Sequence, residues 1–195
     1  MDYAGGGDLA HAINVAFKEG SGLKDSWVRA ATYQVCSALE YMHSKGVIHC
    51  DLKPANVMLV EPYDDKHDQL PHALLVDFGL SQIFEERRSA GVEAQVKGSP
   101  AYLAPEGFEG HLTQKSDMWA VGIIVCEMLT GKRPFPGGAN LFMIWAQVTK
   151  SEPNLENLQP DPRELAKALL EKDPKVRPTA QECSANFAWL KHQDY

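Results

Sequence analysis

The sequence predicts an α+β fold that is mostly α-helical and contains one small β-hairpin. Three observations indicate this. Residues 27–42 carry apolar side chains at helical spacing, residues 56–60 and 73–77 form two apolar runs of strand length, and helical patterns with start and stop signals continue from residue 116. With 195 residues, 44% of them hydrophobic, the chain is long enough for one well-packed core, so we expect one domain or a large lobe.

The first elements are a glycine-rich turn and a short helical pattern, both within the run YAGGGDLAHAI. A stronger helical pattern follows, with apolar residues recurring at i, i+3 and i+4. These residues are Trp27, Ala30, Ala31, Val35, Ala38, Leu39 and Met42. Because glycine readily adopts a left-handed conformation, we expect Gly46 to end this amphipathic helix as its C-cap.

Two short apolar runs come next, NVMLV at 56–60 and ALLVD at 73–77, and each predicts a buried strand. The segment between them, EPYDDKHDQLPH, holds two prolines and four acidic residues, so we expect a solvated loop. Residues 80–103 are polar and show no sustained periodicity, which indicates a long, mobile loop that carries function.

The rest of the chain reads as helical. The run SDMWAVGIIVCEMLTGKRPF is apolar on nearly all sides, so it predicts a central buried helix that stops at Gly131 and Pro134. In DPRELAKALLEKDP we expect Asp161 as N-cap, Pro162 at N1 and Glu164 at N3, which is a capping-box arrangement. In PTAQECSANFAWL we expect Thr179 and Glu182 to form a second capping box.

Composition excludes several classes of function. A formal charge of −7 argues against nucleic acid as the main partner, because phosphate binding requires a basic face. The longest apolar run covers about half of a membrane span, and no basic segment precedes an apolar one at the N-terminus, so we expect no membrane anchor and no signal peptide. Cys36, Cys50, Cys126 and Cys183 lie far apart, which favours a reducing, cytoplasmic setting over a zinc or disulfide framework.

The chemistry concentrates in the run HCDLKPANVMLV, residues 49–60, where Asp51, Lys53 and Asn56 precede a strand and Asp77 follows the next one. If the two strands pair, the loop and strand ends bring Asp51, Asn56 and Asp77 close together. Two carboxylates and an amide oxygen form a hard oxygen site that suits Mg²⁺, and Lys53 could neutralise phosphate charge. Such a set fits phosphoryl transfer, in which catalysis is mostly positioning and electrostatics.

Three motifs in this order and spacing, HCDLKPANVM, DFG at 77–79 and APE at 104–106, resemble the catalytic loop, metal loop and activation-segment end of eukaryotic protein kinases. SDMWAVG is similar to the central helix of that family, and DPKVRPTA to the arginine motif before its last helix. The resemblance runs from residue 1 to about residue 190. The lysine of DLKPAN and the run GSPAYLAPE resemble the serine/threonine class.

The resemblance implies a kinase-like C-terminal lobe whose small β-hairpin carries the catalytic and metal loops, with ATP and Mg²⁺ as cofactors. It implies a hinge at 1–7, a catalytic loop at 49–56, an activation segment at 77–106 and a helical subdomain at 107–195. Asp51 would then be the catalytic base, Lys53 would sit at the transferred phosphate, and Asn56 and Asp77 would bind Mg²⁺.

The other implied roles fall into three groups. Those at the adenine and ribose of ATP belong to Tyr3, Ala4, Asp8 and Met58. Those toward the protein substrate belong to Ser99 and Glu127. The structural roles belong to His49, Phe78, Glu106, Asp117 and Arg177, of which Glu106 and Arg177 resemble a buried ion pair and Asp117 resembles the residue that holds the catalytic-loop backbone.

Several of these positions also have simpler explanations. Asp8 could only cap the helix that starts at Leu9, and Glu127 could be a partner within the helical core. Because Glu127 and Asp8 match positions that read basic residues in some kinases, protein substrates with basic residues near the phosphoacceptor are one option. We expect His49 to pack near Phe78 and the other histidines to lie at the surface.

The sequence departs from the kinase pattern in two ways. Cys50 replaces the arginine that usually precedes the catalytic aspartate and pairs with a phosphate; cysteine cannot make that contact, so we hypothesise that no arginine-clamped phosphate in residues 80–103 switches this protein. The chain also starts at its hinge-like segment, without a glycine-rich phosphate loop or strand lysine, so we expect the N-terminal lobe to be absent.

Three functions therefore remain open: a fragment of an active serine/threonine kinase, a non-catalytic pseudokinase-like binding or scaffold module, and an unrelated Mg²⁺ phosphohydrolase. The retained Asp51, Lys53, Asn56 and Asp77 favour the first, and the missing lobe favours the second. The activation segment disfavours the third. We expect an N-terminal lobe or a partner to cover the ATP-facing surface, which would otherwise expose Met58 and Phe78.

Overall fold

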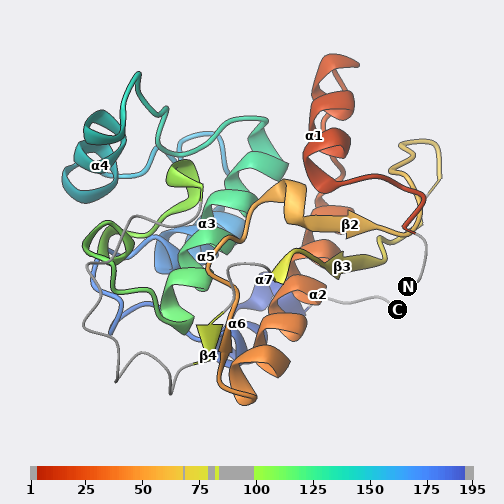
Figure 1. The fold of residues 1–195 in the computed structure, drawn as a ribbon. Helices are drawn as coiled ribbons and strands as arrows, with labels where there is room; N and C mark the ends of the chain where they lie inside the picture. The colour runs from red at the N-terminus through yellow and green to blue at the C-terminus, as the bar shows by residue number, and fades with distance from the viewer. Residues whose placement is uncertain (1–3, 68, 79–81, 84–98, 192–195) are drawn as a thin grey trace.

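A computed structural model describes residues 4–67, 69–78, 82–83 and 99–191. These residues form a mostly helical molecule with two short, separate strand pairs (Figure 1). The α-helices are α1 (Leu9–Lys18), α2 (Asp25–Ser44), α3 (Gln114–Thr130), α4 (Leu141–Lys150), α5 (Pro160–Leu169), α6 (Ala180–Asn186) and α7 (Ala188–Lys191). The strands are β1 (Val47–Ile48), β2 (Val57–Leu59), β3 (Ala73–Leu75) and β4 (Gln82–Ile83). In the part of the chain that the structure describes, short 3₁₀ helices cover Pro54–Asn56, Pro100–Tyr102 and Pro105–Glu109.

Strands β2 and β3 form the predicted hairpin, although both are shorter than the apolar runs that predicted them. They pair antiparallel, with Val57 opposite Leu75 and Leu59 opposite Ala73. Val57 and Leu59 are buried, but every residue of β3 is only half-buried. The prediction of a buried strand was therefore wrong for β3, which packs against α2 and keeps part of its surface open.

A second strand pair was not predicted. β1 and β4 lie antiparallel, with Val47 opposite Ile83 and Ile48 opposite Gln82. Two-residue strands are too short to show the alternation that identifies a strand in a sequence. This pair falls partly inside the predicted loop 80–103, which also contains the 3₁₀ helix Pro100–Tyr102. Residues 84–98 of that loop lie outside the described residues.

The core is built around α3, as its apolar sequence predicts. It is buried on nearly all sides and packs against α2 and α5. Thr113 caps its N-terminus in a capping box with Ser116, and Gly131 ends it in the left-handed region at φ 68°. α2 is an amphipathic helix over the predicted residues. Its C-cap is Lys45 and not the predicted Gly46, which follows at φ 72°.

The C-terminal helices confirm one capping prediction and contradict another. Thr179 and Glu182 form the expected capping box at the start of α6. Asp161 is not an N-cap, because α5 starts earlier, with Gln159 as N-cap and Pro160 in its first turn. Proline is favoured there because its fixed φ is already helical and its missing N–H is not needed.

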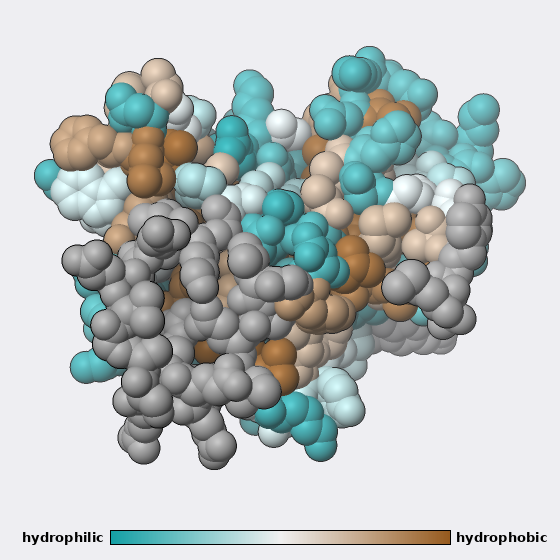
Figure 2. Space-filling model, in the orientation of Figure 1, coloured by the Kyte–Doolittle hydropathy of each residue, from teal (hydrophilic) through white to brown (hydrophobic). Residues whose placement is uncertain are grey.

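α4 and the hairpin lie on opposite sides of α3 (Figure 1). Only Val148 of α4 is buried, and three successive residues, Leu141, Phe142 and Met143, are 44%, 69% and 45% exposed. Figure 2 shows hydrophobic side chains gathered over this helix. None of the described helices combines the length and apolarity needed to cross a membrane.

Candidate functional site

Asp51, Lys53 and Ser99 meet in one polar cluster, although 46 residues separate Lys53 from Ser99 in the chain. Lys53 Nζ donates to Asp51 Oδ2 at 2.8 Å and to Ser99 Oγ at 3.0 Å. The backbone N–H of Ser99 donates to Asp51 Oδ1 at 2.8 Å. Each carboxylate oxygen of Asp51 therefore has its own donor, so the side chain is held in one orientation.

These contacts determine the charge of Asp51. Burial of the side chain raises its pKa, but hydrogen bonds from Lys53 and Ser99 and the charge of Lys53 outweigh burial, so the pKa lies below its ordinary value. Asp51 is thus a carboxylate at neutral pH. It is a weak base that can accept a hydrogen bond from a hydroxyl group and hold that group in place. It can take the hydroxyl proton once the hydroxyl oxygen begins to bond to an electrophile, because the proton then becomes more acidic.

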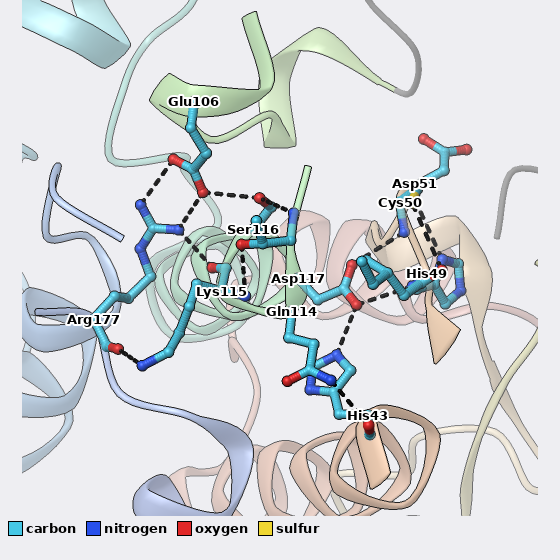
Figure 3. A network of polar contacts seen from close by, with 12 residues as sticks. His43, His49, Cys50, Asp51, Glu106, Gln114, Lys115, Ser116, Asp117 and Arg177 are labelled. Atoms are coloured by element: carbon cyan, nitrogen blue, oxygen red, sulfur yellow. Dashed lines mark hydrogen bonds and ion pairs between the residues drawn. The ribbon is translucent and has the colours of Figure 1, made fainter. Parts of the chain in front are cut away.

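Asp117 holds the backbone of the loop that carries Asp51 (Figure 3). Its side chain is 2% exposed and accepts hydrogen bonds from the backbone N–H groups of His49 at 2.9 Å and Cys50 at 3.1 Å. His43 Nε2 lies 2.9 Å from the same carboxylate. Cys50 itself has φ 70°, a strained conformation for a residue with a side chain, so its geometry depends on these contacts.

His49 joins the loop to the end of the hairpin. Its Nε2 lies 3.1 Å from the carbonyl oxygen of Val76, and its Nδ1 accepts from the backbone N–H of Asp51 at 3.4 Å. This pattern assigns the proton to Nε2. The imidazole also contacts the Phe78 ring, with 5.5 Å between ring centroids. His49 therefore ties the backbone of residues 49–51 to residues 76–78.

Asn56 and Asp77 are the remaining members of the predicted Mg²⁺ site. Asn56 Nδ2 donates to the carbonyl oxygen of Asp51 at 2.8 Å, so the amide is anchored through its nitrogen. The backbone N–H of Val76 donates to the carbonyl oxygen of Asn56 at 3.0 Å, which places Asp77 one residue from this contact. Asp77 is exposed and has φ 63°, a second strained position.

The donor set around Asn56 and Asp77 fits Mg²⁺ better than a softer metal, because it offers carboxylate and amide oxygens without thiolates. Within the described residues there is no cluster of three or more His, Cys, Asp or Glu side chains that could hold a metal ion. A metal at this position would therefore keep several non-protein ligands, as Mg²⁺ does when it binds with phosphates.

The segment before α1 lies against β2. The backbone N–H of Gly6 donates to Leu59, and that of Leu59 donates to Gly7, at 3.0 and 2.8 Å. A Cβ at Gly6 would lie 2.3 Å from the Glu61 backbone, so this close approach requires glycine. Ala4 is half-buried in this segment, and Tyr3 lies outside the described residues.

Asp8 and Met58 meet where this segment reaches β2. They form an isolated antiparallel bridge between the two backbones. The Asp8 carboxylate accepts the backbone N–H of His11 at 2.7 Å, so it is the N-cap of α1. The simpler explanation of Asp8 is thus present in the structure, and a contact with ribose would be an additional role. Met58 is half-buried.

Glu127 lies near the C-terminal end of α3 and faces Tyr102. The Tyr102 hydroxyl donates to Glu127 Oε2 at 2.8 Å, and Arg133 Nε lies 4.0 Å from Oε1. Burial raises the pKa of the Glu127 carboxyl, although Tyr102 and Arg133 act in the opposite direction. Tyr102 ends the 3₁₀ helix Pro100–Tyr102, and its backbone N–H donates to the carbonyl oxygen of Ser99 at 2.9 Å. It therefore connects Glu127 to the Asp51 cluster.

Glu106 and Arg177 form an ion pair with two hydrogen bonds beside the first turn of α3 (Figure 3). Arg177 Nη1 and Nη2 lie 2.8 and 3.2 Å from the two carboxylate oxygens, and Arg177 is fully buried. Ser116 Oγ also donates to Glu106, at 2.8 Å. Because Ser116 precedes Asp117, this ion pair and the contacts of Asp117 with the His49 and Cys50 backbone share one turn of α3.

Sequence reasoning missed three residues at the site: His43, Tyr102 and Arg133. His43 was expected at the surface, but its side chain is 8% exposed and contacts Asp117, 74 residues away. No local pattern could have identified it, since the contact depends on how α2 and α3 pack. Tyr102 and Arg133 lie in the runs GSPAYLAPE and SDMWAVGIIVCEMLTGKRPF, whose patterns predicted a kinase motif and a buried helix but no contact with Glu127.

The family model described as "Protein kinase domain" matches residues 1–189. Relatives include CBL-interacting serine/threonine-protein kinase 15 of Arabidopsis thaliana, 32% identical over 98% of this chain, and serine/threonine-protein kinase ULK3 of Xenopus laevis, 34% identical over 98%. The chain spans 42% and 39% of the lengths of these two relatives, so it corresponds to less than half of each.

Proposed function

Because this chain belongs to the eukaryotic protein kinase family, we propose that it is the catalytic-lobe part of a serine/threonine protein kinase. Such a kinase transfers the γ-phosphate of ATP to serine or threonine hydroxyls of protein substrates. The single observation that carries the proposal is the cluster of Asp51, Lys53 and Ser99, in which a carboxylate and an ammonium group are hydrogen-bonded to each other and both contact Ser99. We extend the proposal to the domain arrangement: hinge 1–7, catalytic loop 49–56, activation segment 77–106 and helical subdomain 107–195.

In the proposed reaction the substrate hydroxyl oxygen forms a bond to the γ-phosphorus, and the bond from that phosphorus to the bridging oxygen of ADP breaks. Asp51 orients the hydroxyl group and accepts its proton. Lys53 is positioned to offset negative charge on the transferred group, since its ammonium already lies 2.8 Å from Asp51. Mg²⁺, when bound, would neutralise phosphate charge.

We propose roles for the other residues as well. Asn56 and Asp77 would hold Mg²⁺ through oxygen atoms, at the junction of the catalytic loop and the hairpin. Tyr3, Ala4, Asp8 and Met58 would contact the adenosine part of ATP, with Ala4, Asp8 and Met58 in and beside the segment that pairs with β2. Ser99 would hold the start of the substrate-binding segment against Asp51.

One observation favours a second function. Phe78 is 51% exposed beside the hairpin, which suits a face that another lobe or protein covers. A chain that used this face only to bind a partner would be a non-catalytic scaffold.

The four cysteines are buried and not joined in disulfides, so we place either function in the reducing cytoplasm.

We do not extend the proposal to basic substrates. Such a preference would depend on Glu127 and Asp8, whose carboxylates are engaged by Tyr102, Arg133 and the start of α1.

The test is Asp51→Asn in the full protein encoded by the native transcript. We expect the rate of phosphate transfer from ATP to a serine peptide to fall about 10²- to 10⁴-fold, while the thermal unfolding midpoint falls by only about 2–4 °C, because the lost ion pair with Lys53 is partly exposed. Asp64→Asn, the same change at an exposed loop position, is the matched control and should keep full activity. A wild-type protein that transfers no phosphate, yet binds a partner through the Phe78 face, would support the scaffold instead.

A further inference from the structure

A groove at the C-terminal end of α3 has a charge pattern that bears on substrate choice. It encloses about 450 Å³ and is lined by residues that include Glu127, Lys132, Arg133, Asn154 and Asn157. Tyr102 connects it to the catalytic cluster, because its hydroxyl donates to Glu127 and its backbone N–H donates to the carbonyl oxygen of Ser99 at 2.9 Å. A substrate chain bound at Asp51 could therefore extend into this groove.

The carboxylate of Glu127 is already engaged within its own chain. Tyr102 occupies Oε2, Arg133 faces Oε1 at 4.0 Å, and the Glu127 side chain is 19% exposed. A basic side chain of a substrate would have to compete with Arg133 for the same carboxylate, and it would meet the positive charge of Arg133 while doing so. A cation bound to the Glu127 carboxylate would lie close to the Arg133 guanidinium and be repelled by it, so the groove disfavours lysine and arginine side chains of a substrate.

The position of Arg133 is fixed by more than its charge. Its Nη2 lies 3.7 Å from the place where a Cβ on Gly137 would be, so the guanidinium packs against that glycine. Gly137 is in turn held by Gln147 of α4, through hydrogen bonds of 3.0 and 2.7 Å to its backbone N–H and carbonyl groups. Arg133 is thus confined between Glu127 and the loop that leads into α4.

The remaining lining gives the groove a positive balance. Lys132 is exposed beside Arg133, while Asn154 and Asn157 are uncharged and can donate amide hydrogens. With Glu127 offset by Arg133, Lys132 supplies the uncompensated charge. Carboxylates accept hydrogen bonds from lysine, arginine and asparagine, so an acidic side chain fits this lining better than a basic or neutral one.

We propose that Arg133 and Lys132 make this groove selective for protein substrates with an acidic residue near the phosphoacceptor, and that Arg133 excludes basic ones. This inference rests on the proposed kinase function, since it assigns the substrate class of the same site. Arg133 and Lys132 have separable roles: Arg133 blocks Glu127 from cationic side chains, and Lys132 attracts anionic ones.

The decisive experiment measures peptide binding by fluorescence anisotropy, which does not require phosphate transfer. Three labelled peptides share one serine acceptor and differ at a single position upstream of it, which is glutamate, alanine or arginine. Wild-type full-length protein should bind the glutamate peptide about three- to tenfold more tightly than the arginine peptide. Arg133→Ala should reverse this order, because it frees the Glu127 carboxylate.

Two further variants separate the roles. Lys132→Ala should lose the preference for glutamate over alanine while the arginine peptide stays the weakest. Lys175→Ala removes the same charge from an exposed position outside the groove, so it should match wild type and controls for net charge. Tighter wild-type binding of the arginine peptide, or an unchanged order in Arg133→Ala, would overturn the inference.

Phosphate transfer to the same peptides is measured in parallel. If the protein binds the peptides in the expected order but transfers no phosphate to any of them, the proposed catalytic function fails and the groove assignment stands. If it transfers phosphate with no dependence on the upstream residue, the catalytic function stands and the groove assignment fails.

Discussion

Cys50 shows how one residue can separate this chain from the pattern it otherwise follows. Cys50 is 7% exposed in a small apolar cluster with Ile48, Leu103 and Leu112, and its backbone N–H donates to Asp117. An arginine at this position could pair with a phosphate through two parallel hydrogen bonds. A cysteine side chain is a neutral thiol or an anionic thiolate, so the loop before Asp51 has no cation at this position.

We therefore expect the activity of this protein to be independent of phosphate on residues 80–103. Treating the active protein with a phosphatase should leave the rate of phosphate transfer within about twofold of its starting value, because no charge-assisted contact is lost. The control is Cys50→Arg, which restores the cation. A treated wild-type protein without activity, with the same loss in Cys50→Arg, would contradict this expectation.

At the scale of the element, helix ends show where local sequence is sufficient. Thr179 and Glu182 satisfy each other's backbone: Glu182 accepts the Thr179 N–H at 2.7 Å, and Thr179 Oγ1 accepts the Glu182 N–H at 3.1 Å. All the atoms involved lie within four residues, so the sequence predicts this contact. The N-cap of α5 was predicted at Asp161, two residues after the observed Gln159, because two prolines near one helix start offer competing first turns.

The capping box makes α6 sensitive to pH in a definite direction. The Thr179 backbone N–H, followed by its hydroxyl, holds the pKa of Glu182 below its ordinary value. Since the folded state favours the carboxylate, this contribution to stability is fully present above the ordinary glutamate pKa of about 4.3 and is lost as the pH falls through the lowered value.

Glu182→Gln keeps the side chain's size and removes its charge. At pH 7 the free energy of unfolding should fall by about 0.5–1 kcal/mol relative to wild type, and near pH 3 the difference should approach zero. Urea unfolding at both pH values measures it. A difference that is the same at pH 3 and pH 7 would show that the charge of Glu182 contributes nothing.

At the scale of the whole molecule, prediction from sequence depended on distance along the chain. The mostly helical fold, α2, α3 and the β2–β3 hairpin follow from periodicity within each segment. Which side chains meet across segments does not. The contacts of Ser99 with Lys53 and of His43 with Asp117 join residues 46 and 74 positions apart, and helix packing determines them. The resemblance to kinases identified several of these residues, but Arg133 has its role only because of its neighbours in space.

The Glu106–Arg177 pair is one of the long-range contacts that meet at the start of α3, and its loss should affect the loop that carries His49, Cys50 and Asp51. Arg177 is fully buried, and its Nη1 and Nη2 donate to Glu106, 71 residues away in the chain. Glu106 also accepts from Ser116, the neighbour of Asp117, which in turn holds the His49 and Cys50 backbone. Removing the charge of Glu106 should therefore both destabilise the fold and loosen the loop.

Glu106→Gln leaves a buried guanidinium without its counter-charge, which typically costs about 3–5 kcal/mol. Arg177 keeps hydrogen bonds to the carbonyl oxygens of Lys115 and Glu171, so we expect the low end of this range. Urea unfolding should show a lower midpoint with an unchanged slope. Glu109→Gln, three residues along the same short helix and with an exposed side chain, is the matched control and should change stability by less than about 0.5 kcal/mol.

Hydrogen exchange distinguishes a local effect from a global one. In Glu106→Gln the amide protons of His49 and Cys50 should exchange faster than the loss of global stability explains, because the Ser116–Asp117 turn that orients their acceptor is released. If every amide of the core accelerates by the same factor, the ion pair stabilises the fold without positioning the catalytic loop. Equal exchange at His49 and Cys50 in both proteins, together with a reduced urea midpoint, would lead to the same conclusion.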